Sequence, residues 1–284
     1  MIEKKKMLAI ELDPPPDDDI SNFMEGARLF SEAGADIITI ADCPIGRPRA
    51  DSCMLAAKIK RELGVEALPH MTCRDRNLNA THALLLGLSI EGIRDVLIVT
   101  GDPIPKEVRE TVKCIFNFGS VTLMKYISEL NEATFKSPMT IYGALNVNSL
   151  SFDSQLEHAR DKIEVGCKGF LTQPVLSDTA IENIKRAGDV LDAKILGGIY
   201  PPVSYNNAVF MNEKVHGVSV GEDIIAMYEG LDRQEGERLG EKIALDMARK
   251  IHPYVDGYYL MTPFKRITMM TNIIEAMKQE GLLE

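Results

Sequence analysis

Eight short apolar segments, separated by longer amphipathic ones, recur along the chain, and this alternation constrains the fold more than any other feature. Residues that favour strands dominate the short segments, which are Met7 to Leu12, Asp36 to Ala41, Ala67 to Thr72, Val96 to Thr100, Thr140 to Ala144, Gly169 to Gln173, Lys194 to Ile199 and Gly257 to Met261. Helical patterns fill the intervals at residues 20–33, 50–63, 78–88, 121–130, 154–165, 178–190, 221–251 and 267–278. This order is typical of parallel sheets built from βα units.

Eight such units in 284 residues favour a closed (β/α)8 barrel, the TIM barrel, over a six-stranded doubly wound sheet. No GxGxxG motif follows the first segment, which is a further argument against a doubly wound dinucleotide-binding fold. The chain has no short repeat, low-complexity tract or Gly/Ser linker. We therefore expect the α/β class and one barrel domain over residues 1–284. Residues 14–19 are predicted to form a loop, with Asp19 as an N-cap.

Composition narrows the function classes. The formal net charge of −10 disfavours binding to nucleic acids and to anionic membrane surfaces. Five cysteines without a CxxC pair support neither a disulfide framework nor a zinc ribbon and fit a reducing cytoplasm. Glu11 and the acidic, proline-rich run after it interrupt the first apolar stretch too early for a signal peptide or membrane span. We expect a cytoplasmic protein, and a homo-oligomer by its size class.

Polar residues stand at the C-terminal end of nearly every predicted strand, where (β/α)8 barrels place their active sites. In chain order these ends carry Glu11, Asp42, His70, Thr72, Thr100, Gly101, Asp102, Asn146, Asn148, Gln173, Tyr200, Tyr205 and Thr262. Taken singly, Glu11 fits a solvated strand end, Asp102 a turn and His70 a core histidine. Gln173 is harder to explain, because an amide in a buried strand needs hydrogen-bond partners that a ligand could supply. Their convergence predicts a site.

A metal centre is one alternative reading of these strand ends. Glu11, Asp42, His70 and Asp102 could supply oxygen and nitrogen ligands, but one histidine without HxH or HxxxH spacing disfavours zinc. A phosphate site after the seventh and eighth strands is common in barrels. Here the segment G-G-I-Y-P-P offers small residues without a diagnostic motif.

Read together, the strand-end motifs resemble those of the methylenetetrahydrofolate reductase family along essentially the whole chain. They are A-I-E-L-D-P-P in the first strand, A-L-P-H-M-T-C in the third, V-T-G-D-P in the fourth, G-F-L-T-Q-P in the sixth and G-G-I-Y-P-P-V-S-Y in the seventh. The chain departs from the family at Leu12 and Asp13, where two aromatic residues are frequent, and at Thr100, where an arginine is frequent. These departures resemble the branch fused to homocysteine methyltransferases or found in acetogenic bacteria.

The resemblance implies reduction of 5,10-methylenetetrahydrofolate to 5-methyltetrahydrofolate, in one-carbon metabolism and methionine biosynthesis. Hydride would pass from NADH or NADPH through a bound flavin, FAD or alternatively FMN. Glu11 would be the general acid, and Asp102 would tune the charge near flavin and folate. The flavin-binding residues implied are His70, Thr72, Thr100, Gly101, Asp102, Asn146 and Lys162. The implied substrate-binding residues are Gln173, Tyr205 and Arg266.

Two other functions stay open at this point. One is a flavin-free, folate-binding methyltransferase barrel that passes a methyl group to a corrinoid or a thiol. The other is a noncatalytic subunit that docks onto an electron-donor protein or a methyltransferase partner. Barrels host many chemistries, so the fold class alone does not choose among the three.

Overall fold

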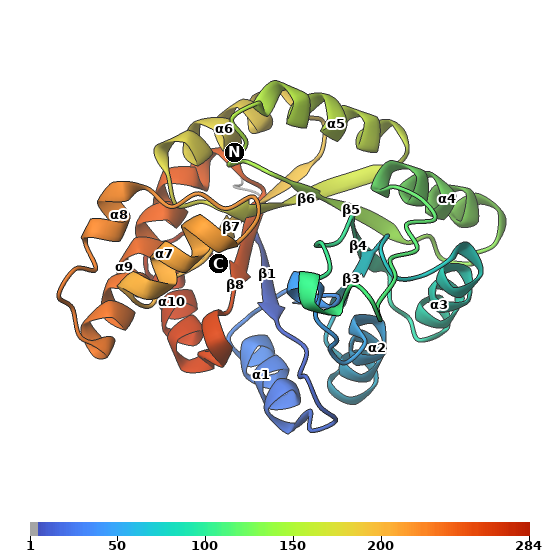
Figure 1. Ribbon diagram of the computed structural model, residues 1–284, viewed down its shortest axis with the longest axis horizontal. Helices are drawn as coiled ribbons and strands as arrows, with labels where there is room; N and C mark the ends of the chain where they lie inside the picture. Colours follow the sequence, from blue (N-terminus) through green and yellow to red (C-terminus); the bar gives the residue numbers. More distant parts are fainter. Residues whose placement is uncertain (1–4) are drawn as a thin grey trace.

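Eight parallel strands close into a ring in chain order, with β8 pairing back onto β1 (Figure 1). The computed structural model describes residues 5–284. The strands are β1 (Met7–Leu12), β2 (Ile37–Ile40), β3 (Ala67–Thr72), β4 (Asp95–Val99), β5 (Thr140–Leu145), β6 (Cys167–Pro174), β7 (Lys194–Ile199) and β8 (Gly257–Met261). The predicted (β/α)8 barrel is confirmed.

Helices surround the strands as an outer layer (Figure 1). They are α1 (Ser21–Glu32), α2 (Ser52–Leu63), α3 (Leu78–Ile90), α4 (Ser120–Ala133), α5 (Phe152–Glu164), α6 (Asp178–Val190), α7 (Tyr205–Lys214), α8 (Glu222–Ala226), α9 (Arg233–Ile251) and α10 (Ile267–Gln279). Short 3-10 turns, η1 (Pro44–Gly46), η2 (Lys106–Val108), η3 (His252–Tyr254) and η4 (Pro263–Lys265), lie between them. Most predicted helices agree with these bounds to within a few residues.

The prediction of one long helical segment over 221–251 is wrong. α8 ends at Ala226, Gly230 takes a left-handed conformation with φ of 77°, and Asp232 then caps α9. Asp232 accepts a hydrogen bond from the Glu235 N–H while the Glu235 side chain accepts one from the Asp232 N–H, which is a capping box. The helical pattern of apolar residues continues across residues 227–232, so the pattern alone does not reveal that α8 ends and α9 begins there.

Two further local predictions need correction. Helix α7 was not expected, although Ser204 caps it by accepting a hydrogen bond from the Asn207 N–H. Asp19 is not the N-cap of α1, because that position belongs to Ile20. The Asp19 carboxylate nevertheless accepts the N–H of Ser21, the first residue of the helix, at 3.0 Å.

The buried residues form two layers. One lies between the strands and the helices, and a smaller cluster fills the barrel interior, with Ala9, Leu68 and Tyr259 among its members. Side chains two residues apart on a strand point to the same side. Glu11 follows Ala9 by two positions and His70 follows Leu68 by two, so both polar side chains continue the interior stacks at the C-terminal ends of their strands.

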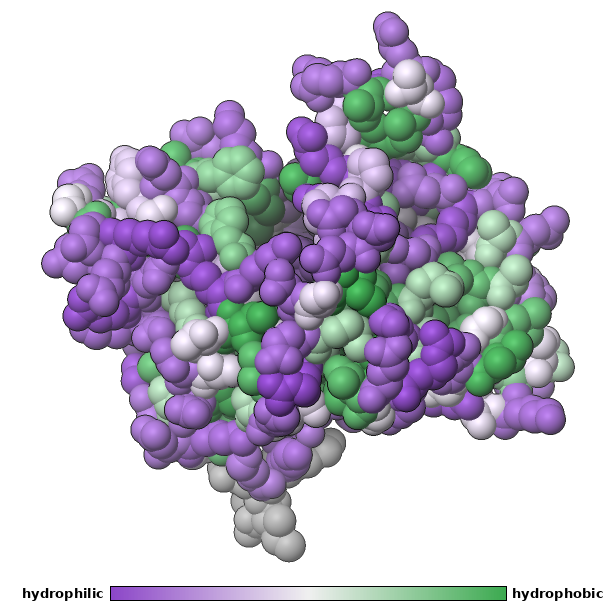
Figure 2. Space-filling view, turned by 90° about the horizontal axis from the view of Figure 1, so that it is seen from below, coloured by the Kyte–Doolittle hydropathy of each residue, from purple (hydrophilic) through white to green (hydrophobic). Residues whose placement is uncertain are grey.

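The surface is largely hydrophilic on the face shown in Figure 2, with smaller hydrophobic patches scattered over it. A hollow lies between two projecting parts at the upper edge of that view, and hydrophobic residues line part of it (Figure 2). Within residues 5–284, none of the helices combines the length and apolar character needed to cross a bilayer.

Candidate active site

Three side chains from three strands meet inside the barrel, near the C-terminal ends of the strands. The hydroxyl of Tyr259 on β8 donates a hydrogen bond to Oε2 of Glu11 on β1. Nε2 of His70 on β3 lies 3.7 Å from the same oxygen and has no hydrogen-bond partner among the described residues. Thr262 fixes the backbone at this point, since its hydroxyl donates to the Glu11 carbonyl oxygen at 2.7 Å. The barrel thus presents one carboxyl group in a largely buried setting.

Burial shifts the proton affinities of this cluster in a consistent way. It raises the pKa of Glu11 to about 8, helped by the negative charge of Asp13 and opposed by the Tyr259 hydrogen bond. Burial also lowers the pKa of His70 to about 4. A buried carboxyl group keeps its proton and a buried imidazole loses one, because each avoids a charge in a poorly solvated place. Near neutral pH the site therefore holds a protonated acid beside a neutral imidazole.

Asp42 has a different role from that of Glu11. Its carboxylate accepts hydrogen bonds from the Thr72 N–H and hydroxyl, at 2.9 and 3.0 Å, and from Arg76 at 2.8 Å. Burial opposes the charge, but Arg76 and Thr72 together hold the pKa of Asp42 below its usual value. Thr72 was predicted to line the flavin, and here its hydroxyl is committed to Asp42.

No cluster of three or more metal-ligating His, Cys, Asp or Glu side chains occurs within residues 5–284. The four residues considered for a metal centre are divided between different contacts. Asp42 binds Arg76, Glu11 binds Tyr259, and Asp102 binds a backbone N–H. These contacts give the three carboxylates separate partners.

Asp102 lies exposed at the rim, where it ties two loops together. Its Oδ2 accepts the N–H of Ile45 at 2.7 Å, and its carbonyl oxygen accepts a hydrogen bond from buried Arg74 at 2.9 Å. Gly101 before it has φ of 96°, and a Cβ there would lie 2.9 Å from Thr72 Cβ. Thr100 is exposed and lies just beyond the end of β4. The loops after β2, β3 and β4 are therefore held close together at this rim.

Asn146 and Asn148 organise the loop after β5. Oδ1 of Asn146 accepts the Asn148 N–H at 3.0 Å, and the Asn148 amide donates to the carbonyl oxygens of Pro174 and Gly217. Oδ1 of Asn148 is buried and has no hydrogen-bond partner within residues 5–284. Gln173 is half-buried on β6, next to Pro174. This side of the barrel offers amide groups, one with an unused acceptor.

The structure brings Glu11 and His70 together, but it gives three other predicted site residues separate surroundings. Lys162 is buried, its ammonium donates to the Ala144 carbonyl oxygen at 2.8 Å, and burial lowers its pKa. Tyr205 is 42% exposed at the start of α7. Nε of Arg266 donates to Glu237 at 2.9 Å. Lys162 and Arg266 thus already have protein partners.

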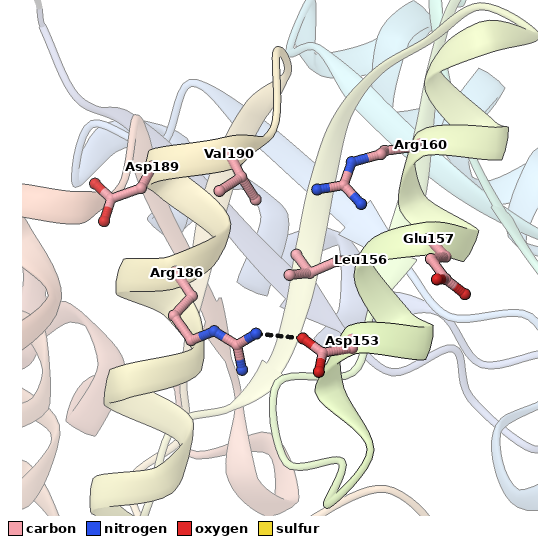
Figure 3. A pocket seen from close by; sticks show the side chains of 7 residues that line it. All are labelled: Asp153, Leu156, Glu157, Arg160, Arg186, Asp189 and Val190. Atoms are coloured by element: carbon pink, nitrogen blue, oxygen red, sulfur yellow. Dashed lines mark hydrogen bonds and ion pairs between the residues drawn. The ribbon is translucent and has the colours of Figure 1, made fainter.

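Among the pockets in the structure, one lies beside this cluster and another lies apart from it. One, of about 290 Å³, lies beside the strand ends and is lined by Leu12, Asp13, Pro15, Asp19, Asn22, Phe23, Thr262, Lys265 and Ile267. The other, of about 400 Å³, lies in the helix layer between α5 and α6, where Arg186 reaches across to Asp153 (Figure 3). None of the predicted site residues lines the second pocket.

Sequence reasoning missed Tyr259, which makes the closest contact to Glu11. One signal was available, because Tyr259 lies two residues before Met261 in a strand that ends there, and alternate residues face the interior. Thr39 on β2 was also missed; its buried hydroxyl lies close enough to Tyr259 to affect the pKa of that phenol.

The fold and the cluster define a (β/α)8 barrel that carries a largely buried acid at the C-terminal ends of its strands. The sequence model of the family described as methylenetetrahydrofolate reductase matches residues 1–278. The chain belongs to this family.

Individual relatives are distant. The chain is 23% identical over 205 residues to 5,10-methylenetetrahydrofolate reductase of Buchnera aphidicola subsp. Baizongia pistaciae, which covers 70% of this chain and 65% of that protein. The Escherichia coli K12 protein of the same name is 24% identical over 198 residues, covering 67% and 63%. The chain thus spans just under two thirds of the length of these relatives.

Solved structures share the fold at low sequence identity. A Clostridium thermocellum protein that binds two copies of 5-methyl-5,6,7,8-tetrahydrofolic acid has a TM-score of 0.69, 13% identity, and coverage of 98% of this chain and 96% of that one. The long-chain alkane monooxygenase LadA has a TM-score of 0.61, 12% identity, and coverage of 100% and 93%. At these identities the likeness concerns the barrel.

Proposed function

We propose that the protein reduces 5,10-methylenetetrahydrofolate to 5-methyltetrahydrofolate, with Glu11 as the general acid. The observation that carries the proposal is the largely buried Glu11 carboxyl group beside Tyr259 and His70, whose pKa is raised to about 8. Family membership supports the reaction class. The Clostridium thermocellum neighbour, a barrel of the same fold that binds 5-methyltetrahydrofolate, supports a folate as the substrate.

The chemistry needs an acid of this kind. An amine nitrogen of the folate five-membered ring leaves its carbon poorly until it is protonated. Glu11 would deliver that proton, the carbon–nitrogen bond would break, and the resulting iminium carbon would accept hydride. A general acid is most effective when its pKa lies near the working pH, and burial brings Glu11 there. His70 stays neutral beside it, so it supplies no positive charge that would force Glu11 to ionise.

The residues at the strand ends fit a flavin, because the barrel keeps unused polar atoms there. Within the part of the chain that the structure describes, Nε2 of His70 and Oδ1 of Asn148 are buried without hydrogen-bond partners, and such atoms call for a ligand or water. A bound flavin, FAD or FMN, would supply the hydride relay between the electron donor and the folate.

Other predicted residues would help to hold these ligands. The exposed Thr100 and Asp102 and the intermediate Gly101 form one rim of the site, and Asn146 lies at the end of β5. Lys162 would need to exchange its bond to Ala144 to reach the flavin. Gln173, Tyr205 and Arg266 would contact the folate or the nicotinamide. The donor would be NADH, NADPH or a reduced partner protein.

The test is an anaerobic absorbance experiment on the purified protein, with addition of NADH or NADPH and then of methylenetetrahydrofolate. Flavin that is bleached by the donor and reoxidised by the folate supports the proposal. In Glu11→Gln we expect donor bleaching to persist and folate-driven reoxidation to slow by at least about 100-fold, the usual scale of a lost general acid. The matched control is Glu275→Gln, an exposed glutamate on α10. A Glu11→Gln protein that reoxidises normally would remove the role of Glu11.

A further inference from the structure

Tyr259 lies inside the barrel on the strand next to that of Glu11. The register of β1 and β8 places Tyr259 opposite Ala9, two residues before Glu11. Because Ala9 is small and faces the interior, the phenol ring can extend past it toward the end of the barrel. Its hydroxyl donates a hydrogen bond to Oε2 of Glu11.

This phenol occupies a layer that is otherwise mostly apolar. Tyr259 is 6% exposed and packs in the interior cluster with aliphatic residues such as Leu68, Leu97 and Leu196. A buried hydroxyl costs free energy unless it is hydrogen-bonded, and the Glu11 carboxyl supplies a partner. An apolar side chain of similar size could fill the same space without a hydroxyl. The hydrogen bond to Glu11 is therefore the feature that distinguishes Tyr259 from its aliphatic neighbours.

We infer that Tyr259 is a positioning residue for Glu11. Its hydroxyl donates a hydrogen bond to Oε2, so the acidic hydrogen of Glu11 is carried on the other oxygen, Oε1, which points away from β8. The inference rests on the proposed role of Glu11 as the proton donor to the folate. A carboxyl group held in this way presents its proton in one orientation, whereas an unheld carboxyl group rotates among several. Orientation of the reacting group is a large part of what an active site contributes.

The hydrogen bond also tunes the acid. The titratable groups that face Glu11 are His70 on β3, Tyr259 on β8, Tyr200 at the end of β7 and Asp13 in the loop after β1. Burial and Asp13 raise the pKa of Glu11, while the Tyr259 hydrogen bond lowers it. His70 is neutral at working pH, and Tyr200 is a neutral phenol whose own pKa is raised by burial. Tyr259 therefore opposes the shift that burial imposes.

The first experiment follows the Glu11 proton without any reaction. Carboxyl 13C NMR of protein labelled on glutamate is recorded across pH for wild type, Tyr259→Phe and Tyr142→Phe, with Glu11→Gln to assign the signal. Tyr142 is the matched control, a second buried tyrosine of the barrel interior, on β5 across the ring. We expect Tyr259→Phe to raise the Glu11 midpoint by about one pH unit, the effect of one hydrogen bond to a charged group, and Tyr142→Phe to leave it unchanged.

A second substitution works in the opposite direction. Replacing Tyr259 by 3-fluorotyrosine makes the phenol a stronger donor with almost unchanged shape, so the Glu11 midpoint should fall. The inference is overturned if the midpoint is the same in wild type, Tyr259→Phe and the fluorotyrosine protein. Circular dichroism spectra of the variants check that each one is folded.

The kinetic experiment separates this inference from the proposed function. In Tyr259→Phe we expect kcat for folate reduction to fall by about 10-fold at neutral pH, with KM within a factor of two and the basic limb of the pH profile displaced upward. A fall in rate without displacement of that limb would mean a merely structural role and would overturn the inference. If the Glu11 midpoint moves but wild type reduces no folate, the proposed function fails while the coupling of Tyr259 to Glu11 stands.

Discussion

Nε2 of His70 lies 3.7 Å from Oε2 of Glu11, and this close approach is not an ion pair. The pKa of Glu11 is raised to about 8 and that of His70 is lowered to about 4, so both groups are mainly uncharged at pH 7. A charged pair would need stronger solvation than the barrel interior offers. The barrel therefore stores a proton on the carboxyl group at a pH where an exposed glutamate has lost it.

This stored proton reduces the stability of the folded protein as the pH rises. The folded state keeps the Glu11 proton up to its raised pKa of about 8, whereas the unfolded chain releases the proton near the ordinary glutamate pKa of 4.5. The unfolded state thus binds fewer protons in this range, so the free energy of unfolding falls with rising pH, by at most about 1.4 kcal/mol per unit. Glu11→Gln removes this titration. We expect its stability advantage over wild type to grow from pH 5 to pH 8 and then to level off.

Urea unfolding at pH 5.5, 7 and 8.5 measures this difference. The exposed Glu275→Gln serves as the control and should differ from wild type by a constant amount. A constant difference for Glu11→Gln as well would show that Glu11 titrates alike in the folded and unfolded states.

Much of this arrangement could be predicted from the sequence because it depends on local periodicity. The bounds of β1, β3, β7 and β8 agree with those read from the apolar segments. Alternation within β1 and β3 is enough to place Glu11 and His70 on the interior face, and both residues lie toward the C-terminal ends of parallel strands. The break at Gly230 and the short helix α7 were not predicted, because capping groups there act inside or beside a continuing apolar pattern.

The contacts that define the site depend on information that is not local. Tyr259 reaches Glu11 because the last strand pairs with the first in one register, and the sequence does not state that register. Thr72 was predicted to line the flavin; the structure adds that its hydroxyl donates to Asp42 in the loop after β2, a contact that the sequence does not state. The contact of Lys162 could not be predicted either, because its long side chain donates to a backbone carbonyl oxygen on β5, a different element of the fold.

Gly101 is predicted to be intolerant of a side chain. Its φ of 96° is unfavourable for other residues, and an added Cβ would lie 2.9 Å from Thr72 Cβ and 3.2 Å from Arg74 Cβ. Gly101→Ala should therefore lower the free energy of unfolding by about 2–4 kcal/mol through backbone strain and overpacking. Gly92→Ala is the control, because Gly92 has φ of 79° but open space around its Cβ position, and only about 1 kcal/mol is expected. Equal losses in urea unfolding would contradict the crowding at Gly101.

Asp42 should matter far more for stability than a carboxylate in an exposed ion pair. Its side chain is 3% exposed and holds Arg76 together with the Thr72 N–H and hydroxyl. Asp42→Ala leaves the Thr72 N–H and hydroxyl without their acceptor and leaves Asp51 as the remaining carboxylate partner of Arg76, so we expect a loss of about 3 kcal/mol. Asp153→Ala removes an exposed partner of Arg186 and should cost at most about 1 kcal/mol. Urea unfolding at pH 7 compares the two variants, and similar losses would mean that the Asp42 network contributes little.

Because the pKa of Asp42 is lowered in the folded protein, its contribution to stability is present above the ordinary carboxyl pKa. The gap between Asp42→Ala and wild type should therefore shrink as the pH falls below about 4.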